Sequence, residues 1–326
     1  MKAFVTGGSG FLGINLIKQL VEKGWQVTAV HRASSSLADL KSLEITLVEA
    51  SLLDKQQLRN VIPDQIDAIF HIAGDTNMWF KNNDRQYQTN VTATQNLVDV
   101  AIEKHVGRFI HTSSVSAYGF HKGTITEDTK STAMTSGVNY LKTKYLGEQV
   151  VKKAVAERGL DAVCLNPCAI IGPYDRGNWS QLFTMIQQGT LPGVPAGEGS
   201  YCHVREVAAA HIAAFEQGQK GENYLLAGTD SSFLNVVKKI GILLDKQTPN
   251  KTLPTCLIKT LGFVSNIWSF ITNKEPNITP EKALMVTKRV VAKSEKAKSE
   301  LNYVDNIEID EMLKDCFDWM KLEKLI

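Results

Sequence analysis

The stretch TGGSGFLG at residues 6–13 lies between a short apolar run and a segment with helical spacing. Its glycines Gly7, Gly10 and Gly13 are spaced three residues apart. A tight turn requires the first glycine, a pyrophosphate can approach the backbone at the second, and the third lets the helix pack closely on the strand. The start of the helix then offers free N–H groups and a positive dipole end to an anion. The stretch therefore predicts a strand–turn–helix unit that holds a dinucleotide, and an ordinary glycine-rich turn is the less favoured alternative.

The first half of the chain alternates between short apolar runs and segments with helical spacing. The expected strands are residues 2–6, 26–30, 45–48, 67–71, 108–111 and 162–165. The expected helices are residues 11–22, 54–61, 84–104 and 140–157. Strands that alternate with helices of this length form right-handed βαβ units around a parallel sheet. We therefore predict an α/β fold with a Rossmann-type, doubly wound parallel sheet.

The pattern changes after Pro167. Glycines and prolines are dense between residues 172 and 199, which predicts long loops over a site, with one helix near residues 179–188. From Phe233 onward helical patterns dominate, and the last of them spans Ile309–Leu322. We expect two domains. They are an NAD(P)-binding domain of residues 1–166 with returning segments at about 203–227, and a smaller, mostly helical substrate lobe of residues 167–202 and 228–326.

Composition excludes several classes of protein. The chain has 326 residues, of which 43% are hydrophobic and 21% are charged, and its formal net charge is +2. This is the composition of an ordinary globular protein rather than of a disordered or low-complexity chain. A polyanion-binding surface usually shows as a strong basic excess, so we expect no nucleic-acid partner.

Cysteines are sparse, and their spacing indicates neither disulfides nor metal. There are five, none of them in a CxxC pair, and an odd number fits poorly with a disulfide framework. Such usage suits a reducing compartment, and we expect a cytoplasmic protein. The first residues run straight into a strand pattern, which leaves no room for a signal peptide. No group of His, Cys and Asp residues has zinc spacing, so we predict no metal site.

Residues 256–271 form the most apolar stretch of the chain. The stretch is short and contains Lys259 and Asn266, so we expect no transmembrane segment. A packed helix or a lid is the favoured interpretation. The alternative is an amphipathic surface helix at the entrance for a hydrophobic substrate.

Further motifs follow the glycine turn in a fixed order. They are HIAG at residues 71–74, NVTATQNL at 90–97, HTSSVSAYG at 111–119, YLKTK at 140–144, NPCAIIGP at 166–173 and HVREVAAAH at 203–211. Together with Thr6 and the Gly-x-x-Gly-x-x-Gly spacing, they resemble the extended branch of the short-chain dehydrogenase/reductase superfamily, the NAD-dependent epimerase/dehydratase family. The resemblance runs from residue 2 to about residue 227. The helical tail loosely resembles the dihydroflavonol reductase and 3β-hydroxysteroid dehydrogenase group.

The predicted catalytic residues are Ser114, Tyr140 and Lys144. Tyr140 and Lys144 are four residues apart on an expected helix and share one face. A phenol has a pKa of about 10, and a nearby ammonium lowers it, which would make Tyr140 a usable general acid or base. The resemblance implies that Lys144 also bonds the nicotinamide ribose and that Ser114, at the end of a strand, bonds the reacting oxygen. Ser113 and Ser116 are the alternatives for the serine.

The glycine turn and the resemblance together imply a set of residues that contact the dinucleotide. Pro167 to Ile170 would wall the nicotinamide, and Ser51 stands where related proteins usually carry an Asp that touches the adenine. The full predicted set is Thr6, Gly7, Gly10, Phe11, Leu12, Gly13, His31, Arg32, Ser35, Ser51, Leu52, Ile72, Ala73, Gly74, Tyr140, Lys144, Pro167, Cys168 and Ile170.

The end of the second expected strand favours NADP. An NAD site usually places an acid there to hold the ribose hydroxyls, whereas an Arg suits a 2′-phosphate. His31, Arg32 and Ser35 occupy this region. The alternative is that Arg32 is an ordinary surface charge and that the cofactor is NAD.

These features predict an NAD(P)-dependent oxidoreductase that acts on CH–OH or C=O groups. The leading hypothesis is an NADPH-dependent reductase of a ketone or aldehyde, with a proton from Tyr140. The runner-up is an NAD-dependent sugar-nucleotide epimerase, against which stand Arg32 and Asn166, where many sugar-nucleotide relatives have Arg. Dehydration is disfavoured because the Asp-Glu pair of related dehydratases is absent beside Ser114. A cofactor-sensing regulator is a third hypothesis, but its Tyr/Lys pair would be broken.

Several residues keep two interpretations. Asn90 orients a helix or a water, or is a structural amide; His71 and His111 pack in the core or line the site. Four aromatic residues line an apolar pocket or simply pack in the lobe: Trp79, Phe80, Tyr174 and Trp179. By resemblance, the helices at residues 84–104 and 140–157 pair across the axis of a homodimer.

Overall fold

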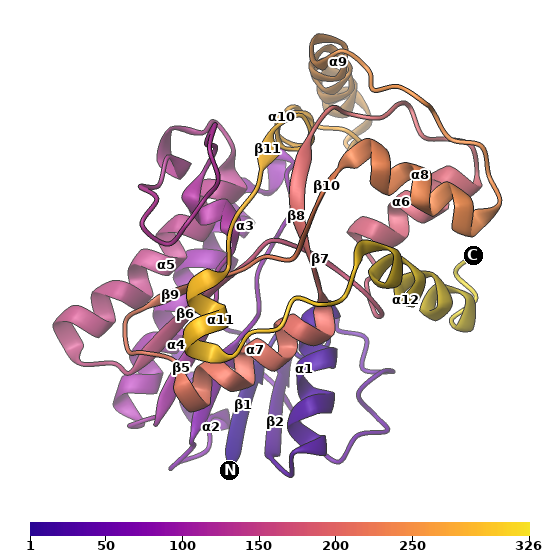
Figure 1. Cartoon of the computed structure of the whole chain (residues 1–326). Helices are drawn as coiled ribbons and strands as arrows, with labels where there is room; N and C mark the ends of the chain where they lie inside the picture. Colours follow the sequence, from indigo (N-terminus) through magenta and orange to yellow (C-terminus); the bar gives the residue numbers. More distant parts are fainter.

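The computed structural model describes residues 1–326, except for the side chain of residue 271. A large parallel sheet with helices on both faces forms the lower part of the molecule in Figure 1, and a lobe of helices and short strands lies above it. The strands of the large sheet run upward from the N-terminus, so their carboxyl ends face the lobe.

The large sheet has seven parallel strands in the order β3-β2-β1-β4-β5-β6-β9. This confirms the predicted Rossmann-type, doubly wound α/β fold. The strands are β1 (Lys2–Thr6), β2 (Gln26–His31), β3 (Thr46–Glu49), β4 (Ala68–His71), β5 (Arg108–Thr112), β6 (Ala162–Pro167) and β9 (Asn223–Leu226).

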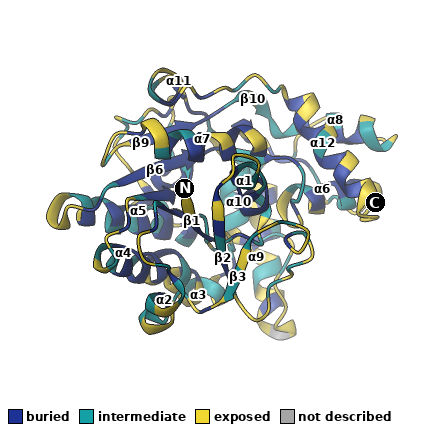
Figure 2. Ribbon diagram, turned by 90° about the horizontal axis from the view of Figure 1, so that it is seen from below, coloured by how far each residue is buried: buried dark blue, intermediate teal, exposed yellow. Residues whose placement is uncertain are grey.

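Both faces of this sheet are buried by helices, as Figure 2 shows by the dark colour of the sheet. Successive side chains of a strand point to opposite faces, so Phe4 and Val5 of β1 belong to different core clusters. The Val5 face is covered by α1 (Phe11–Glu22) and α7 (Val204–Gln217). The Phe4 face is covered by α2 (Lys55–Val61), α4 (Ala93–Glu103) and α5 (Asn139–Arg158).

The helix expected at residues 84–104 is interrupted. It consists of α3 (Asn83–Tyr87), a π-helical turn η2 (Gln88–Thr92) and α4. The turn lies against α5 so closely that a Cβ on Gly147 would be 2.4 Å from the carbonyl oxygen of Asn90. The extra residue of the π turn therefore accommodates a close helix crossing, and it places the Asn90 side chain toward the sheet edge.

The lobe contains a second sheet that the sequence analysis did not predict. Its central strand β8 (Glu198–His203) pairs with β7 (Ala169–Ile171), β10 (Thr229–Ser232) and β11 (Arg289–Val290). Of its strand residues, only 198–199, at the start of β8, fall within the expected loop region 172–199. The lobe helices are α6 (Asn178–Gln187), α8 (Phe233–Leu244), α9 (Thr255–Thr272), α10 (Pro280–Val286), α11 (Glu295–Leu301) and α12 (Ile309–Leu322).

The chain after residue 228 does not stay in the lobe throughout. Helix α11 packs on α7 and β9, and Tyr303 Oη donates a 3.0 Å hydrogen bond to the carbonyl oxygen of Ala227. Three short 3-10 turns complete the structure: η1 (Phe80–Asn82), η3 (Val115–Tyr118) and η4 (Ala133–Thr135). Among the described residues, no helix combines the length and apolar content that a bilayer crossing requires.

Candidate active site

The glycine turn has the geometry that its spacing predicts. Gly7 has a φ of +70°, and a Cβ there would lie 2.7 Å from the backbone nitrogen of Ala73 at the end of β4. A Cβ on Gly13 would lie 2.1 Å from the carbonyl oxygen of Gly7. Gly10 is the N-cap of α1, and no described side chain caps that helix. The first turn of α1 thus keeps backbone N–H groups for an anion, which fits the diphosphate of a dinucleotide.

A buried hydrogen-bond chain fixes the neighbouring strand ends. Thr6 Oγ1 lies 2.8 Å from His71 Nδ1, and His71 Nε2 lies 2.9 Å from Thr94 Oγ1. Thr94 donates its own proton to the carbonyl oxygen of Asn90, so we infer that His71 carries its proton on Nε2. Burial lowers the pKa of His71 to about 3, with a smaller contribution from Lys144, so the ring is neutral. His71 therefore packs and holds strand ends rather than lining the site.

Helix α5 brings Tyr140 and Lys144 to the carboxyl edge of the sheet, one turn apart and both buried. Lys144 Nζ donates a 2.8 Å hydrogen bond to the carbonyl oxygen of Thr112 at the end of β5. Burial lowers the pKa of Lys144 to about 8, and the carboxylate of Glu148 opposes that shift. Gly74 lies close beside the amine, because a Cβ there would be 3.8 Å from Nζ.

The expected lowering of the Tyr140 pKa by Lys144 is wrong for this structure. Burial raises the pKa of the phenol, since the charged form loses more water than the neutral one. The hydroxyls of Ser114 and Ser116 oppose the shift, and the Asp75 carboxylate adds to it. The two serines, rather than the ammonium, are thus the groups that favour phenolate here.

Ser114 occupies the position predicted for it, at the end of β5. It is the N-cap of η3, and its Oγ accepts a 3.1 Å hydrogen bond from the backbone N–H of Ser116. Ser113 is turned away, since its hydroxyl donates to Glu148 Oε2 at 2.7 Å within the core. Of the three candidate serines, Ser114 and Ser116 thus lie beside Tyr140.

A buried polar network that the sequence analysis missed supports this edge. Asn166 Nδ2 donates to Glu148 Oε2 at 2.8 Å and to the carbonyl oxygen of Ser114 at 3.1 Å, and Asn166 Oδ1 accepts from Asn223 at 2.8 Å. The network fixes the backbone at Ser114 through the hydrogen bond from Asn166 to its carbonyl oxygen. One signal was available in the sequence, because Glu148 lies four residues after Lys144 on the same helix face.

Asn90 acts as a structural amide. Its Nδ2 donates to the carbonyl oxygen of Asp75 and to Thr143 Oγ1, each at 3.0 Å, and its Oδ1 accepts from the Asp75 N–H at 2.7 Å. These bonds tie the loop after β4 to α5, and with it Gly74 to Tyr140.

The predicted cofactor residues lie along one edge. Apart from Tyr140 and Lys144 on α5, they lie at or after the carboxyl ends of β1, β2, β3, β4 and β6, where parallel α/β sheets bind ligands. Arg32 is exposed, and its backbone N–H donates to Ser35 Oγ at 3.1 Å. Cys168 is buried, and burial raises the pKa of its thiol. The carbonyl oxygen of Ile170 accepts a 2.8 Å hydrogen bond from the indole of Trp179.

The four aromatic residues that either line a substrate pocket or pack in the lobe all have contacts with lobe residues. Trp179 contacts the rings of Tyr201 and Phe233, and Tyr174 contacts Trp319. The indole of Trp79 donates to Ser269 Oγ at 3.3 Å, and Phe80 lies against Phe270. The apolar side chains clustered around Tyr140 are others: Met78, Phe120, Tyr145, Leu284 and Met285. Scattered single Met, Leu and Phe residues give no sequence signal for such a cluster.

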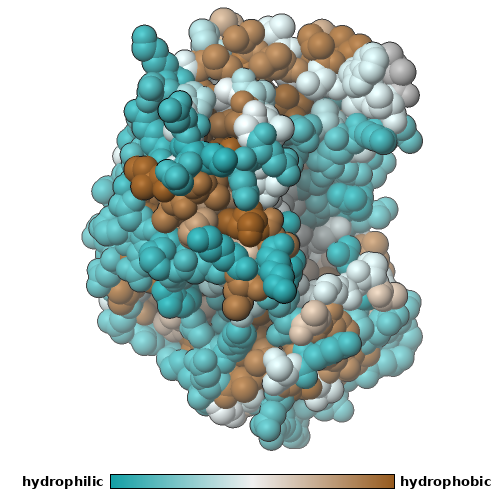
Figure 3. Space-filling model, turned by 90° about the vertical axis from the view of Figure 1, so that its right-hand side faces the viewer, coloured by the Kyte–Doolittle hydropathy of each residue, from teal (hydrophilic) through white to brown (hydrophobic). Residues whose placement is uncertain are grey.

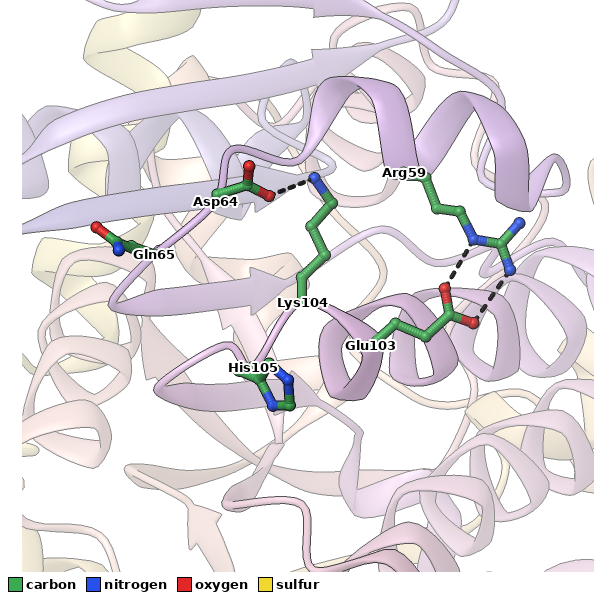
Figure 4. Close-up of a pocket in the computed structure, with 6 residues that line it drawn as sticks. All are labelled: Arg59, Asp64, Gln65, Glu103, Lys104 and His105. Carbon is green, nitrogen blue, oxygen red and sulfur yellow. Dashed lines mark hydrogen bonds and ion pairs between the residues drawn. The ribbon is translucent and has the colours of Figure 1, made fainter.

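A surface hollow lies at the opposite edge of the sheet and does not belong to this site. It is lined by Arg59, Asp64, Gln65, Glu103, Lys104 and His105, near the amino ends of β4 and β5 (Figure 4). Its charged side chains are tied in two exposed ion pairs of 2.7 Å. Ligands bind beyond the carboxyl ends of such strands, so this hollow carries none of the chemistry. Among the described residues, no three metal-ligating side chains gather.

The family described as the NAD dependent epimerase/dehydratase family matches residues 3–227. The chain belongs to this family. The resemblance inferred from the motifs is thereby confirmed, and the protein is an NAD(P)-dependent enzyme of the extended short-chain dehydrogenase/reductase superfamily.

Relatives with related names share most of the chain. A putative dihydroflavonol 4-reductase of Synechocystis sp. is 28% identical over 98% of this chain and 94% of its own length. A 2-alkyl-3-oxoalkanoate reductase of Stenotrophomonas maltophilia is 31% identical over 66% of each. The crystal structure of gox2253 matches with a TM-score of 0.84 and 27% identity, over 98% of both chains.

Proposed function

We propose that this enzyme is an NADPH-dependent reductase of a ketone or an aldehyde, with Tyr140 as the proton donor. The observation that carries the proposal is the placement of Tyr140: buried at the carboxyl edge, beside the hydroxyls of Ser114 and Ser116, with Lys144 one turn away. A general acid needs this kind of position, within reach of a reacting oxygen and held by a rigid helix.

The glycine turn supports a dinucleotide at this edge. Added Cβ atoms at Gly7 and Gly13 would clash with neighbouring backbone, so the tight turn that leads into the start of α1 requires glycine at both positions. When bound, the nicotinamide supplies hydride to the carbonyl carbon. The protein supplies the proton and stabilises the charges that develop. Ser114 donates a hydrogen bond to the carbonyl oxygen, and Tyr140 transfers its proton to that oxygen as negative charge develops. The phenolate left behind is favoured by its contact with Ser116, and the positive charge of Lys144 one turn away adds a longer-range attraction.

The choice of NADPH rests on Arg32. Its side chain is exposed at the end of β2, and no described acid forms an ion pair with it. A free guanidinium at this strand end suits a 2′-phosphate, because a planar fork of donors matches phosphate oxygens.

An apolar carbonyl compound is the substrate class that the surroundings of Tyr140 favour. Met78, Phe120 and Leu284 belong to the cluster around it, and such side chains bind apolar substituents while the hydroxyls orient one oxygen. Two relatives with reductase in their names agree with reduction as the reaction.

The epimerase hypothesis receives no support from the contacts of Asn166. Its side chain is fully buried and already bonded to Glu148, Asn223 and the Ser114 carbonyl. It therefore has no free donor for the phosphates of a sugar nucleotide. The regulator hypothesis requires a broken Tyr/Lys pair, and both residues are present.

The test is to mix the purified protein with NADPH and a panel of alkyl and aryl ketones and aldehydes, and to follow the absorbance of the reduced cofactor. Stoichiometric consumption with at least one carbonyl compound is expected. A co-purifying NAD that does not exchange, together with interconversion of UDP-sugars and no NADPH consumption, would overturn the proposal in favour of the epimerase.

The homodimer remains a prediction. Helices α4 and α5 pack side by side on one face of the sheet and would pair with the same helices of a second copy. Sedimentation equilibrium of the wild type gives the mass that tests it.

A further inference from the structure

Helix α9 exposes most of its large apolar side chains and turns small and polar ones toward the protein. The side chains that face the protein are mostly small or polar, with Gly262 and Ser269 buried. Among the described side chains of α9, Ile258 is the one large apolar residue that is buried. Six large apolar side chains of α9 face away from the protein and are between 44% and 64% exposed. These residues, called the α9 patch below, are Leu257, Phe263, Val264, Ile267, Trp268 and Phe270. At about 100° per residue they cover roughly half of the helix circumference.

The contacts of the inner face prevent α9 from rotating its apolar side inward. A Cβ on Gly262 would lie 3.0 Å from the carbonyl oxygen of Thr279 and 3.1 Å from the Cβ of Ala283, so α10 packs directly on the helix backbone. The indole of Trp79 donates to Ser269 Oγ at 3.3 Å. The α9 patch is therefore a fixed outer surface.

The patch continues beyond the helix. The Phe80 ring lies 4.9 Å from the Phe270 ring, and Lys81 Nζ lies 5.5 Å from the centre of the same ring. The helix has 18 residues and is about 27 Å long at about 1.5 Å per residue. Figure 3 shows brown atoms gathered along the top of the molecule, where Figure 1 places α9. A contiguous apolar surface of this extent marks an interaction site in a globular protein.

The segment that carries the patch is basic. Residues 246–274 contain four lysines and no Asp or Glu, although the whole chain has a net charge of only +2. The four are exposed: Lys246, Lys251, Lys259 and Lys274. The acids that flank this segment are Asp245, which is exposed, and Glu275, which is engaged with Lys282 at 3.2 Å and with the Asn77 amide. The segment of the apolar face thus carries four cations, and none of the four forms an ion pair with a described acid.

We infer that α9 lies on the surface of an anionic lipid bilayer, with the α9 patch in the headgroup–acyl boundary and the lysines on the headgroups. An apolar helical face rich in Trp and Phe with a basic border binds bilayers in this manner. Lysine stems also extend along apolar surface while their ammonium groups remain among the phosphates. The attachment is peripheral, since no described helix can cross a bilayer.

A second copy of the chain fits the patch less well. A two-fold axis through α9 would bring the same lysines of both copies together, and like charges across an interface are unfavourable. An anionic bilayer supplies an apolar phase for the α9 patch and negative charge for the lysines.

The experiment is co-sedimentation of the full chain with vesicles of phosphatidylglycerol and phosphatidylcholine, and with vesicles of phosphatidylcholine alone. We expect binding to the anionic vesicles that weakens with added salt. The Trp emission should also shift to the blue, because Trp268 is 64% exposed whereas Trp25, Trp79 and Trp319 are buried. Trp268→Phe should keep the binding and lose most of the shift. The assay needs no turnover, so its outcome is independent of the proposed reaction.

Matched variants identify the surface. The double variant Phe263→Ser with Trp268→Ser should lose roughly ten-fold or more in vesicle affinity. The control, Tyr87→Ser with Val304→Ser, removes two side chains of similar exposure outside the patch and should bind like the wild type. Lys251→Gln and Lys259→Gln should each cost roughly five-fold on anionic vesicles.

Two outcomes would overturn the inference. One is that the wild-type protein does not bind anionic vesicles, or binds them with the same affinity as the Phe263/Trp268 double variant. The other is a wild-type dimer in sedimentation equilibrium that the same double variant converts to monomer, which would assign the α9 patch to a second copy.

Discussion

Burial governs the protonation of the two ionisable side chains at the centre of the candidate site. It raises the pKa of the Tyr140 phenol and lowers the pKa of Lys144 to about 8. At neutral pH the phenol is therefore protonated, and the amine is mainly an ammonium. This is the charge state in which Tyr140 can donate a proton and Lys144 can stabilise the phenolate that forms.

Removing the phenol hydroxyl tests the proton donor. Tyr140→Phe should lower kcat for carbonyl reduction by roughly 10²- to 10⁴-fold, the range of a lost general acid. The ring remains to fill its apolar surroundings, so the affinity for NADPH, measured by fluorescence titration, should stay within about two-fold of the wild type. Turnover that persists in this variant would show that another group supplies the proton.

The pKa of Lys144 predicts a pH profile. As the pH rises through about 8, Lys144 loses its positive charge one turn from Tyr140, and with it the longer-range attraction for the phenolate that reduction creates, so kcat/KM for reduction should fall above that pH. Tyr140 remains protonated there, because its pKa is raised. Lys144→Arg keeps a positive charge over the whole range and should move the fall to higher pH. A flat wild-type profile up to about pH 9.5 would contradict this assignment.

Arg32 predicts the cofactor preference. Arg32→Ala should weaken NADPH binding by roughly ten-fold or more, the cost of a lost hydrogen bond to a charged group, and leave NADH binding unchanged. Titration of both cofactors against both proteins measures it. An equal loss for the two cofactors would mean that Arg32 acts through the fold of the loop after β2 rather than on a 2′-phosphate.

Sequence reasoning located the residues of the site better than it described their surroundings. Ser114, Tyr140 and Lys144 stand in local motifs, and each lies where its motif places it. The direction of the Tyr140 pKa was wrong because burial depends on tertiary packing, which a four-residue spacing does not contain. The apolar cluster with Met78, Leu284 and Met285 comes from segments far apart in the chain, so no local pattern could have revealed it.

At the scale of elements, the glycine turn depends on space as much as on backbone freedom. Gly7 and Gly24 have nearly the same φ, +70° and +75°. A Cβ on Gly7 would lie 2.7 Å from the Ala73 nitrogen, whereas a Cβ on Gly24 would meet nothing within 4 Å. The two positions therefore separate backbone strain from the close approach of β4.

Alanine at these two positions should have different consequences. Gly24→Ala should cost about 1–2 kcal/mol of unfolding free energy, from the left-handed backbone alone, and leave NADPH affinity unchanged. Gly7→Ala should cost more and weaken NADPH binding, because the turn must move away from β4. Urea unfolding and cofactor titration of both variants measure this. Equal effects of the two substitutions would remove the structural reason given for Gly7.

The elements themselves were predictable where their periodicity is regular. Helix α1 and the terminal helix α12 begin and end as their apolar spacing predicts. The π-helical turn at residues 88–92 was not predictable, because it accompanies a close contact with Gly147 on another helix, α5. Two strands of the second sheet, β7 and β11, have three and two residues, too few for an alternating pattern, and its central strand β8 follows a stretch rich in glycine and proline that predicts loops.

At the scale of the whole molecule, the lobe is attached to the sheet through buried polar contacts. His203, which is fully buried at the start of α7, has its Nε2 3.3 Å from Asp315 of α12. His211 of the same helix donates from Nδ1 to the Val207 carbonyl at 2.7 Å and accepts from Thr112 Oγ1 at 2.8 Å. The joint between α7, β5 and the lobe thus contains two histidines that fold in their neutral form.

Together with His71 and His111, these two histidines predict a steep loss of stability in acid. Burial lowers the pKa of His71 to about 3, that of His203 and of His211 to about 4, and that of His111 well below its usual range. The unfolded chain binds protons at these rings below about pH 6.5, whereas the folded chain does not. Stability therefore falls as the pH drops from about 6.5 toward 4, with each ring contributing up to about 1.4 kcal/mol per pH unit and all four roughly 5.

Urea unfolding at about pH 7, 6 and 5 measures this slope as the change in unfolding free energy per pH unit. His211→Gln removes one of the four rings and should reduce the slope by about 1.4 kcal/mol per pH unit, even if the variant is less stable at neutral pH. His105→Gln is the matched control, because that ring is exposed and should leave the slope unchanged. An unfolding free energy that is the same at about pH 7 and pH 5 would mean that the four buried histidine rings are not neutral in the folded protein.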